Sequence, residues 1–304
     1  MKNCMIVSFP GNTPLAMTIA KQLEMEMGLV EIRDFPDQET YVRIDSDVKN
    51  KTVLLVCGLE HPNNKILTLM FIAQTIKELG ASKICLITPY LPYMRQDKRF
   101  KQGEAITSTL FAKYLSSWID CLITIDPHLH RIKHLSEIYS IPSISVLHAT
   151  QKIAAWIRNN VALPLIIGPD KESQQWVTEV ADLVNAPFVI INKTRYDDRK
   201  VSISMPTIED TSKTPILMDD IISTGTSMLA VIKELIARGF KKPICIGVHG
   251  LCNQDAYDNL MLAGAQTVIT CNTIPHFTNK IDITDIIVEE IKHCIISHRT
   301  DLPT

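Results

Sequence analysis

The chain has 304 residues, room for two domains of ordinary size, and is 46% hydrophobic and 21% charged, as expected of a soluble globular protein. Its net charge of −2 provides no basic field that would favour nucleic acid or an anionic membrane surface. No charged segment followed by an apolar stretch opens the chain, and no apolar run approaches the length of a membrane span, so the sequence predicts a cytoplasmic protein without a signal peptide or membrane helix.

Apolar runs of strand length alternate with segments of helical period along most of the chain. The strand candidates cover residues 4–9, 52–57, 83–88, 121–126, 165–168, 188–191, 215–219, 243–248 and 267–271. The helix candidates include residues 14–27, 64–79, 106–116, 149–158, 173–184, 226–238 and 282–296. This alternation predicts an α/β protein with mainly parallel sheets flanked by helices. Polar residues fall just after the apolar runs, where sites gather in open α/β sheets.

The chain also resembles itself. Residues 52–88 read as strand, loop, helix and strand, with Lys77-Glu78-Leu79-Gly80 before the second strand. Residues 215–249 repeat this order, with Lys233-Glu234-Leu235 in the corresponding place. We infer a duplicated α/β domain whose boundary divides the chain into residues 1–147 and 148–304.

The first polar motif is the turn Phe35-Pro36-Asp37-Gln38-Glu39. The Phe35 ring can stack on a nucleobase, and the carboxylates of Asp37 and Glu39 can accept hydrogen bonds from an exocyclic amine. Taken alone, however, the segment reads more simply as an acidic turn.

A basic loop follows the strand candidate at 83–88. It runs from Pro89 to Glu104, with four cations between Arg95 and Lys101 and aromatic residues before them. Cations and aromatics together after a strand suit a triphosphate, whose charge needs several partners. The simpler reading is a solvated basic loop.

Two further strand candidates end in residues that can bind a metal. Asp126-Pro127-His128 follows one, and Pro169-Asp170 follows the other. A histidine and a carboxylate at strand ends can hold Mg²⁺ through few protein ligands, with phosphates and water completing the coordination shell. Each motif alone is more often structural, so magnesium is predicted only together with a nucleotide.

Residues 192–200 form a polar segment between two β-like runs, and alone they read as a solvated hairpin tip. If the segment is a mobile lid, Lys193 and Arg195 are two positive charges that can close over a developing negative charge.

The last motif lies within residues 216–228. An apolar segment ends at Asp219-Asp220, and Ser223-Thr224-Gly225-Thr226-Ser227 then leads into an amphipathic helix. The carboxylates can accept hydrogen bonds from ribose hydroxyls, while loop amides and hydroxyls can surround a phosphate at the positive end of the helix. An ordinary capped strand–turn–helix does not explain the two carboxylates. The run resembles the phosphoribosyl-pyrophosphate loop of the type I phosphoribosyltransferase fold.

Taken together, the motifs resemble the ribose-phosphate pyrophosphokinase family, and the resemblance extends from Ser8 to the last helix. Its markers are Phe-Pro-Asp-x-Glu at 35–39, Pro-Tyr followed by Arg-Gln-Asp within 89–97, Asp-x-His at 126–128, Pro-Asp at 169–170, Lys-x-Arg at 193–195 and the loop at 219–227. The resemblance implies two tandem type I phosphoribosyltransferase-like domains. It also implies synthesis of phosphoribosyl pyrophosphate from ATP and ribose 5-phosphate, with release of AMP.

The resemblance further implies a role for each motif. The implied ATP-binding residues are Phe35, Asp37, Gln38, Glu39, Arg95, Gln96 and Asp97. The implied ribose 5-phosphate-binding residues are Arg195, Asp219, Asp220, Ser223, Thr224, Gly225, Thr226 and Ser227. His128 and Asp170 would bind the cofactor Mg²⁺, and Lys193 and Arg195 would stabilise the transition state. The implied assembly is a dimer-based homo-oligomer without nucleic-acid or membrane partners.

Several residues depart from the family pattern. Thr226 stands in the sugar-phosphate loop where a small residue is usual, Gln38 replaces a glycine, Pro127 replaces leucine, and Glu172-Ser173 replaces a glycine-containing turn. The charged groups are all retained. Two alternatives therefore stay open: a non-catalytic or weakly active partner subunit, and a phosphoribosyltransferase, which would release no AMP from ATP. The sequence identifies no general base.

Many family members also carry a regulatory phosphate site with a Ser-x-Arg pair just after the first hairpin. Alignment on the flanking apolar residues Ile44 and Val53 places Asp47 and Lys49 at these positions. An aspartate there would repel a phosphate dianion, and lysine lacks the planar fork of arginine. The sequence therefore predicts that this regulation is absent.

Overall fold

A computed structural model describes residues 3–197, 200–204, 206 and 210–297 of the chain. The chain forms two units, one of Met1–Leu147 with Thr284–Thr304 and the other of His148–Ile283. Each unit is built on a six-stranded sheet whose strands all pair in parallel. The predicted α/β class with parallel sheets is therefore confirmed. Within the described residues, no helix is long and apolar enough to cross a membrane.

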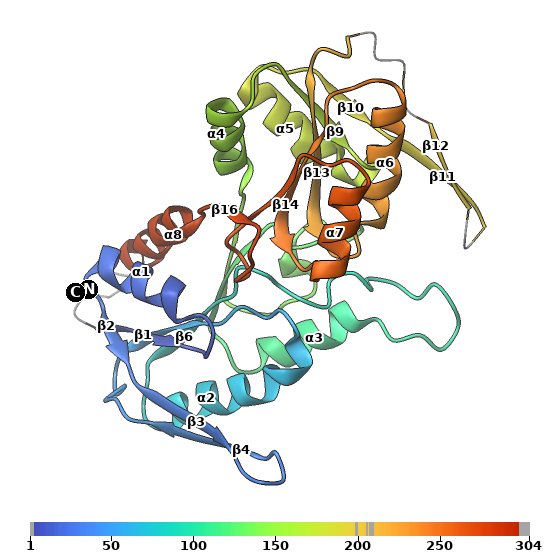
Figure 1. The fold of residues 1–304 in the computed structure, drawn as a ribbon. Coiled ribbons are helices and arrows are strands. Elements are labelled where there is room, and N and C mark those ends of the chain that lie inside the picture. Colours follow the sequence, from blue (N-terminus) through green and yellow to red (C-terminus); the bar gives the residue numbers. More distant parts are fainter. Residues whose placement is uncertain (1–2, 198–199, 205, 207–209, 298–304) are drawn as a thin grey trace. The chain divides into compact units, whose positions relative to one another are not determined.

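The sheet of unit 1 has the strand order β2-β1-β5-β6-β7-β8. Its strands are β1 (Cys4–Ser8), β2 (Glu26–Gly28), β5 (Thr52–Val56), β6 (Lys83–Ile87), β7 (Cys121–Ile125) and β8 (Ser143–Leu147). Helices α1 (Thr13–Leu23) and α8 (Thr284–Ser297) lie on one face, and α2 (Ile66–Glu78) and α3 (Thr107–Ser116) lie on the other (Figure 1). Because both faces are covered, all five residues of β7 are buried, which explains its unbroken apolar run.

A two-stranded hairpin extends unit 1. It consists of β3 (Val30–Asp34) and β4 (Thr40–Ile44), and β4 contacts α2 (Figure 1). Two short 3₁₀ helices, η1 (Pro62–Asn64) and η2 (Leu135–Glu137), lie in the loops that follow β5 and β7.

The sheet of unit 2 has the strand order β10-β9-β13-β14-β15-β16. Its strands are β9 (Pro164–Gly168), β10 (Phe188–Ile190), β13 (Thr214–Ile222), β14 (Ile244–Gly250), β15 (Thr267–Cys271) and β16 (Asn279–Ile281). Helices α4 (Thr150–Asn160) and α5 (Gln174–Val184) lie on one face, and α6 (Thr226–Ala237) and α7 (Gln254–Leu262) lie on the other (Figure 1). The remaining elements are η3 (Lys171–Ser173) and the hairpin of β11 (Asn192–Asp197) and β12 (Lys200–Ser204).

The two sheets repeat one topology. If β1, β5, β6, β7 and β8 are matched with β9, β13, β14, β15 and β16, the two strand orders are identical. This agrees with the duplication inferred from the sequence. It also makes the loop after β5 the counterpart of the loop after β13, because both follow the same position in the sheet.

The observed units differ from the predicted domains in where the last helix belongs. The break after Leu147 agrees with the predicted boundary, but Thr284–Thr304 group with unit 1 and not with residues 148–283. Helix α8 contacts α1 and β8, and its residues Ile287, Val288 and Ile291 are buried. Apolar burial on unit 1 therefore outweighs proximity in sequence to unit 2.

Candidate active site

The turn between β3 and β4 presents an aromatic platform. The backbone N–H of Phe35 donates to the carbonyl of Glu39 at 2.7 Å, and that of Gln38 donates to the carbonyl of Phe35 at 2.8 Å. Phe35 is 41% exposed, and its ring meets that of Tyr41 edge to face, with the ring centroids 6.3 Å apart. The guanidinium of Arg33 lies 5.0 Å from the Phe35 ring centroid and 4.0 Å from that of Tyr41. Phe35 is thus held in place while part of its ring stays accessible.

Gln38 occupies the left-handed position of this turn, with φ of +71°. Three-residue hairpin loops commonly place a glycine there, which gives a physical reason for the glycine usual in the family. We expect Gln38→Gly to raise the thermal unfolding midpoint by about 1–2 °C, because relief of backbone strain exceeds the added entropy of the unfolded chain. Asn50→Gly is the matched control. Its φ is +58°, and asparagine tolerates this region, so its gain should be smaller. An unchanged or lowered midpoint for Gln38→Gly would refute the strain argument.

The basic loop between β6 and α3 is anchored by its backbone and by one carboxylate. The N–H of Ser108 donates to the carbonyl of Gln96 at 3.3 Å. Glu104 Oε2 accepts from the N–H groups of Phe100 and Lys101 at 2.8 and 3.0 Å. Arg95 is exposed and makes no ion pair among the described residues, so its charge is available to a ligand.

Asp97, also predicted to bind ATP, already has a partner within unit 1. Its side chain is 3% exposed and forms an ion pair of 2.7 Å with Arg131, in the segment after β7. Sequence analysis did not single out Arg131, because the two residues are 34 positions apart.

The two predicted magnesium ligands belong to different units. His128 follows β7, and its ring lies edge to face with His130, the centroids 5.8 Å apart. Asp170 follows β9, and its Oδ1 accepts from the N–H groups of Glu172 and Ser173 at 3.1 and 3.3 Å. Within the described part of the chain, no three His, Cys, Asp or Glu side chains gather in a group suited to a metal. If His128 and Asp170 bind a metal, phosphate oxygens and water would have to complete its coordination.

The predicted sugar-phosphate loop is the best-defined part of the site. Strand β13 continues to Ile222 because its ladder with β14 runs on to the pair Ile222↔Gly250. Asp220 therefore lies within the strand together with Asp219, although the predicted strand ended at Asp219, and both residues are half-buried. Gly225 has φ of +67° and precedes Thr226, the first residue of α6.

Hydroxyls and helix amides surround this loop. The Oγ1 atoms of Thr224 and Thr226 lie 3.0 Å apart, so the unusual Thr226 side chain fits at the start of α6. The first N–H groups of a helix lack intrahelical partners and favour an anion. This end of unit 2 can therefore bind a phosphate, while Asp219 and Asp220 can accept from sugar hydroxyls.

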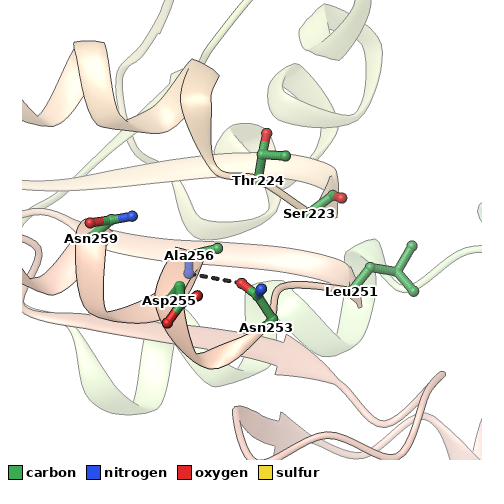
Figure 2. A pocket seen from close by; sticks show the side chains of 7 residues that line it. All are labelled: Ser223, Thr224, Leu251, Asn253, Asp255, Ala256 and Asn259. Atoms are coloured by element: carbon green, nitrogen blue, oxygen red, sulfur yellow. Dashed lines mark hydrogen bonds between the residues drawn. The ribbon is translucent and has the colours of Figure 1, made fainter.

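A cavity of about 350 Å³ opens beside the loop (Figure 2). Its lining consists of Ser223, Thr224, Leu251, Asn253, Asp255, Ala256 and Asn259. The last four are the N-cap and helix residues of α7, a helix that was not predicted. Asn253 caps this helix by accepting from the N–H of Ala256 at 2.9 Å, and an asparagine after an apolar strand is the signal that could have revealed it.

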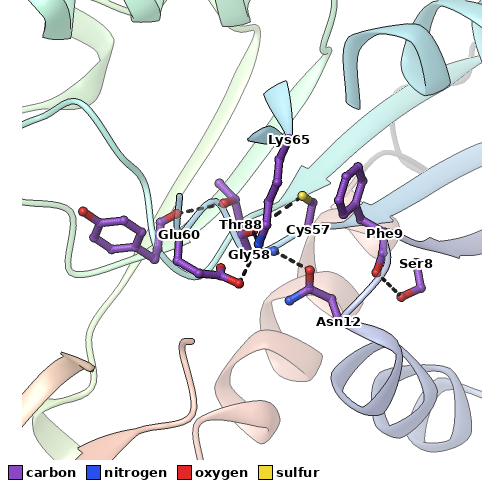
Figure 3. A network of polar contacts seen from close by, with 9 residues as sticks. Ser8, Phe9, Asn12, Cys57, Gly58, Glu60, Lys65 and Thr88 are labelled. Atoms are coloured by element: carbon purple, nitrogen blue, oxygen red, sulfur yellow. Dashed lines mark hydrogen bonds and ion pairs between the residues drawn. The ribbon is translucent and has the colours of Figure 1, made fainter. Parts of the chain in front are cut away.

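In the corresponding loop of unit 1, side chains form a network of polar contacts with the loop (Figure 3). Lys65 Nζ donates to the carbonyl of Gly58 at 2.7 Å and to Glu60 Oε1 at 2.5 Å. The N–H of Gly58 donates to Asn12 Oδ1 at 2.9 Å. A lysine and a glutamate thus close the loop whose counterpart after β13 is open. Among the described residues, the loop after β5 thus differs from its counterpart after β13, which borders a cavity.

Lys193 and Arg195 lie on β11, which pairs antiparallel with β12. The backbone register places Lys193 opposite Ile203 and Arg195 opposite Val201. Their side chains lie outside the described part of the structure, and so do residues 198 and 199 at the predicted hairpin tip. Their predicted catalytic roles remain predictions.

Comparison with known proteins gives matches over both units. A family model described as the N-terminal domain of ribose phosphate pyrophosphokinase matches residues 4–118, and a phosphoribosyl transferase domain model matches residues 134–285. The ribose-phosphate pyrophosphokinase of Sulfurisphaera tokodaii is 32% identical over 272 residues, which cover 88% of this chain and 92% of the relative. That of Saccharolobus solfataricus is 34% identical over 263 residues, with 84% and 88% covered. The crystal structure of phosphoribosylpyrophosphate synthetase from Mycobacterium smegmatis has the same fold, with a TM-score of 0.84, 24% identity, and 97% and 99% covered.

Proposed function

The chain belongs to the ribose-phosphate pyrophosphokinase family, and from this premise we propose that it transfers the β,γ-diphosphoryl group of ATP to the C1 hydroxyl of ribose 5-phosphate. The products are phosphoribosyl pyrophosphate and AMP. The observation that carries the proposal is the extent of the likeness, since the relative from Sulfurisphaera tokodaii aligns over 88% of this chain and 92% of its own length. A phosphoribosyltransferase domain alone would account for residues 134–285 but not for residues 4–118, which match the N-terminal domain of ribose phosphate pyrophosphokinase.

We assign ribose 5-phosphate to the loop of unit 2. The hydroxyls of Ser223, Thr224 and Thr226 and the N–H groups at the start of α6 would hold the 5-phosphate, together with Gly225 and Ser227. The carboxylates of Asp219 and Asp220 would accept hydrogen bonds from the ribose hydroxyls. The adjacent cavity leaves room for the sugar, and its position beside Ser223 and Thr224 supports this assignment.

We assign ATP to the polar loops of unit 1. The accessible face of Phe35 would stack on the adenine, and Asp37 and Glu39 would accept from its exocyclic amine. Arg95 and Gln96 would bind the triphosphate, since Arg95 is an exposed cation without an ion-pair partner among the described residues. Gln38 would contribute through the shape of its turn.

Magnesium fits the chemistry of the two predicted ligands, a carboxylate at Asp170 and an imidazole at His128. When bound, Mg²⁺ neutralises triphosphate charge, and it keeps several positions for phosphate oxygens and water. These residues would therefore help to orient ATP.

The reaction follows from this placement. The C1 hydroxyl oxygen of ribose 5-phosphate attacks the β-phosphorus of ATP, and the bond from that phosphorus to the α,β-bridging oxygen breaks. AMP leaves with the bridging oxygen, and the hydroxyl proton is released. Lys193 and Arg195 would stabilise the negative charge that develops, and Arg195 would also contact ribose 5-phosphate.

One assay tests this function directly. Purified protein is incubated with ATP, Mg²⁺ and ribose 5-phosphate, and AMP is measured by chromatography. We expect AMP formation that depends on ribose 5-phosphate. If no AMP forms unless another subunit is added, the chain is a partner subunit. If AMP never forms but a nucleobase and phosphoribosyl pyrophosphate are joined, it is a phosphoribosyltransferase. We also propose a cytoplasmic, dimer-based homo-oligomer.

Activity should not need inorganic phosphate. The alignment on Ile44 and Val53 puts Asp47 and Lys49 where the family resemblance implies a phosphate-binding Ser-x-Arg pair, and the Asp47 carboxylate accepts from the N–H of Lys49 at 3.1 Å. A carboxylate at this place opposes a phosphate dianion by about 1 kcal/mol. We expect a flat rate when phosphate is titrated in a non-phosphate buffer, with ADP competing only with ATP. Strong sigmoidal activation by millimolar phosphate would show that a regulatory site exists and uses other residues.

A further inference from the structure

The ion pair between Arg131 and Asp97 joins two loops of unit 1. Arg131 Nη1 donates to Asp97 Oδ1 at 2.7 Å, and the Arg131 backbone N–H donates toward Oδ2 at 3.3 Å. Both oxygens of one carboxylate are thus engaged by one residue. The Asp97 side chain is 3% exposed and that of Arg131 is 45% exposed, so the pair is buried on the side of the acid.

Each loop is fixed independently beyond the pair. On the side of Arg131, Glu137 Oε1 accepts from the N–H groups of Lys133 and His134, both at 2.9 Å. On the side of Asp97, the carbonyl of the preceding Gln96 accepts from the N–H of Ser108 at 3.3 Å. The loops follow β6 and β7, which are neighbours in the sheet. The pair therefore links two loops that are each held by their own contacts.

The ion pair also neutralises the negative charge of Asp97 within the basic loop. Asp97 immediately follows Arg95 and Gln96, and an unpaired carboxylate there would oppose a triphosphate. Arg131 cancels that charge. Its guanidinium lies 5.7 Å from the Phe100 ring centroid, and Lys98 Nζ lies 4.9 Å from the same centroid. Arg131 thus supplies one of two cations around Phe100, and the exposed Arg95 is left for the nucleotide.

We propose that Arg131 is a positioning residue for ATP, which acts through Asp97 to hold the basic loop beside the segment that carries His128. The proposal rests on the assignment of ATP to these loops. It changes the predicted role of Asp97, whose carboxylate binds Arg131 and not the nucleotide. In this arrangement the clasp formed by Arg131 and Asp97 sets nucleotide affinity but takes no part in the phosphoryl transfer.

The test compares Arg131→Ala, Arg131→Lys, Asp97→Asn and the double variant Arg131→Ala/Asp97→Asn. We expect Arg131→Ala to raise KM for ATP about fivefold, with kcat and KM for ribose 5-phosphate within about twofold of wild type. The dissociation constant of α,β-methylene-ATP, an analogue that cannot be cleaved between the α and β phosphates, should rise by the same factor. Arg131→Lys should recover most of the affinity, since it retains the charge.

The double variant shows whether Arg131 and Asp97 act on ATP affinity through their contact with each other or independently. Arg131→Ala leaves a buried carboxylate unpaired, so removal of that charge by Asp97→Asn should restore part of the lost affinity. Arg238→Ala is the matched control, because Arg238 belongs to unit 2 and pairs at 2.6 Å with Glu234 of α6. It should leave the KM for ATP unchanged.

Two results would overturn the proposal. One is a KM for ATP within twofold of wild type in Arg131→Ala, and the other is multiplicative losses in the double variant. Thermal unfolding checks that each variant is folded, and if Arg131→Ala is not, Arg131→Lys and Asp97→Asn carry the same comparison. Binding of α,β-methylene-ATP is measured without turnover. If the wild-type protein forms no AMP, the proposed function is refuted, but the effect of the Arg131–Asp97 pair on nucleotide binding can still be measured.

Discussion

Replacing Lys193 with alanine is expected to lower kcat by about 10²-fold or more, the scale for loss of one transition-state donor. The lysine would act mainly as charge develops on the transferred group, so the KM values for ATP and ribose 5-phosphate should change far less. Steady-state kinetics with each substrate varied in turn give both quantities. Binding of α,β-methylene-ATP should be nearly unchanged, which separates a catalytic loss from a binding loss.

Lys200→Ala is the control for this experiment. Lys200 lies on β12, opposite Asp197 in the same hairpin, and no role is assigned to it. Its removal changes the charge of the hairpin equally and should leave kcat within about twofold, because no role in the reaction is assigned to it. If the two variants lose activity to the same extent, the effect reflects hairpin charge alone. If Lys193→Ala retains the wild-type kcat, Lys193 has no part in the mechanism.

Gly225→Ala should raise the KM for ribose 5-phosphate roughly tenfold or more. The φ of Gly225 is +67°, where an alanine costs about 1–2 kcal/mol, and its Cβ would lie 3.1 Å from three atoms of Leu260. The loop would then leave its present conformation, and binding would have to restore it. The KM for ATP should stay within about twofold, because the ATP assignment lies in unit 1.

Gly239→Ala controls for backbone strain. Gly239 follows the other end of α6 with φ of +80°, and its Cβ would meet nothing within 4 Å. This variant should lose stability by a similar amount without a change in the KM for ribose 5-phosphate, and thermal unfolding of both proteins makes the comparison. A tenfold rise in KM for both variants would indicate general destabilisation and would remove Gly225 from the binding loop.

The sequence predicts those elements of the fold whose position follows from the local pattern of apolar residues. Buried parallel strands give continuous apolar runs, and for that reason β1, β5, β6, β7, β9, β14 and β15 were all found near their observed positions. The same reasoning ended β13 too early. Its last residues pair with β14 through the backbone, so Asp219 and Asp220 stay in the strand although their side chains are charged.

Features that depend on distant partners were not predictable. The apolar pattern of α8 predicts that one face of this helix is buried. No feature of its local sequence indicates that α1 and β8 are the elements against which this face packs. The role of Asp97 depends on Arg131, 34 residues later, and the closure of the loop after β5 depends on Asn12 and Lys65. For the candidate site, the sequence supplies the residue types and their order. Only the fold reveals which of these groups are already paired within the protein.

The discontinuity of unit 1 has a consequence for how the protein is made. The ribosome synthesises residues 1–147, then the whole of unit 2, and only afterwards α8. Until α8 emerges, the surface of α1 and β8 that it contacts has no cover from this helix, even though every strand of the first sheet has been translated. Unit 2 has no such dependence, because its residues are contiguous. Unit 1 therefore stays incomplete while unit 2 is being synthesised. A message that stops short of Thr284 would yield all of unit 2 attached to a unit 1 that lacks α8 and exposes apolar surface to chaperones and proteases.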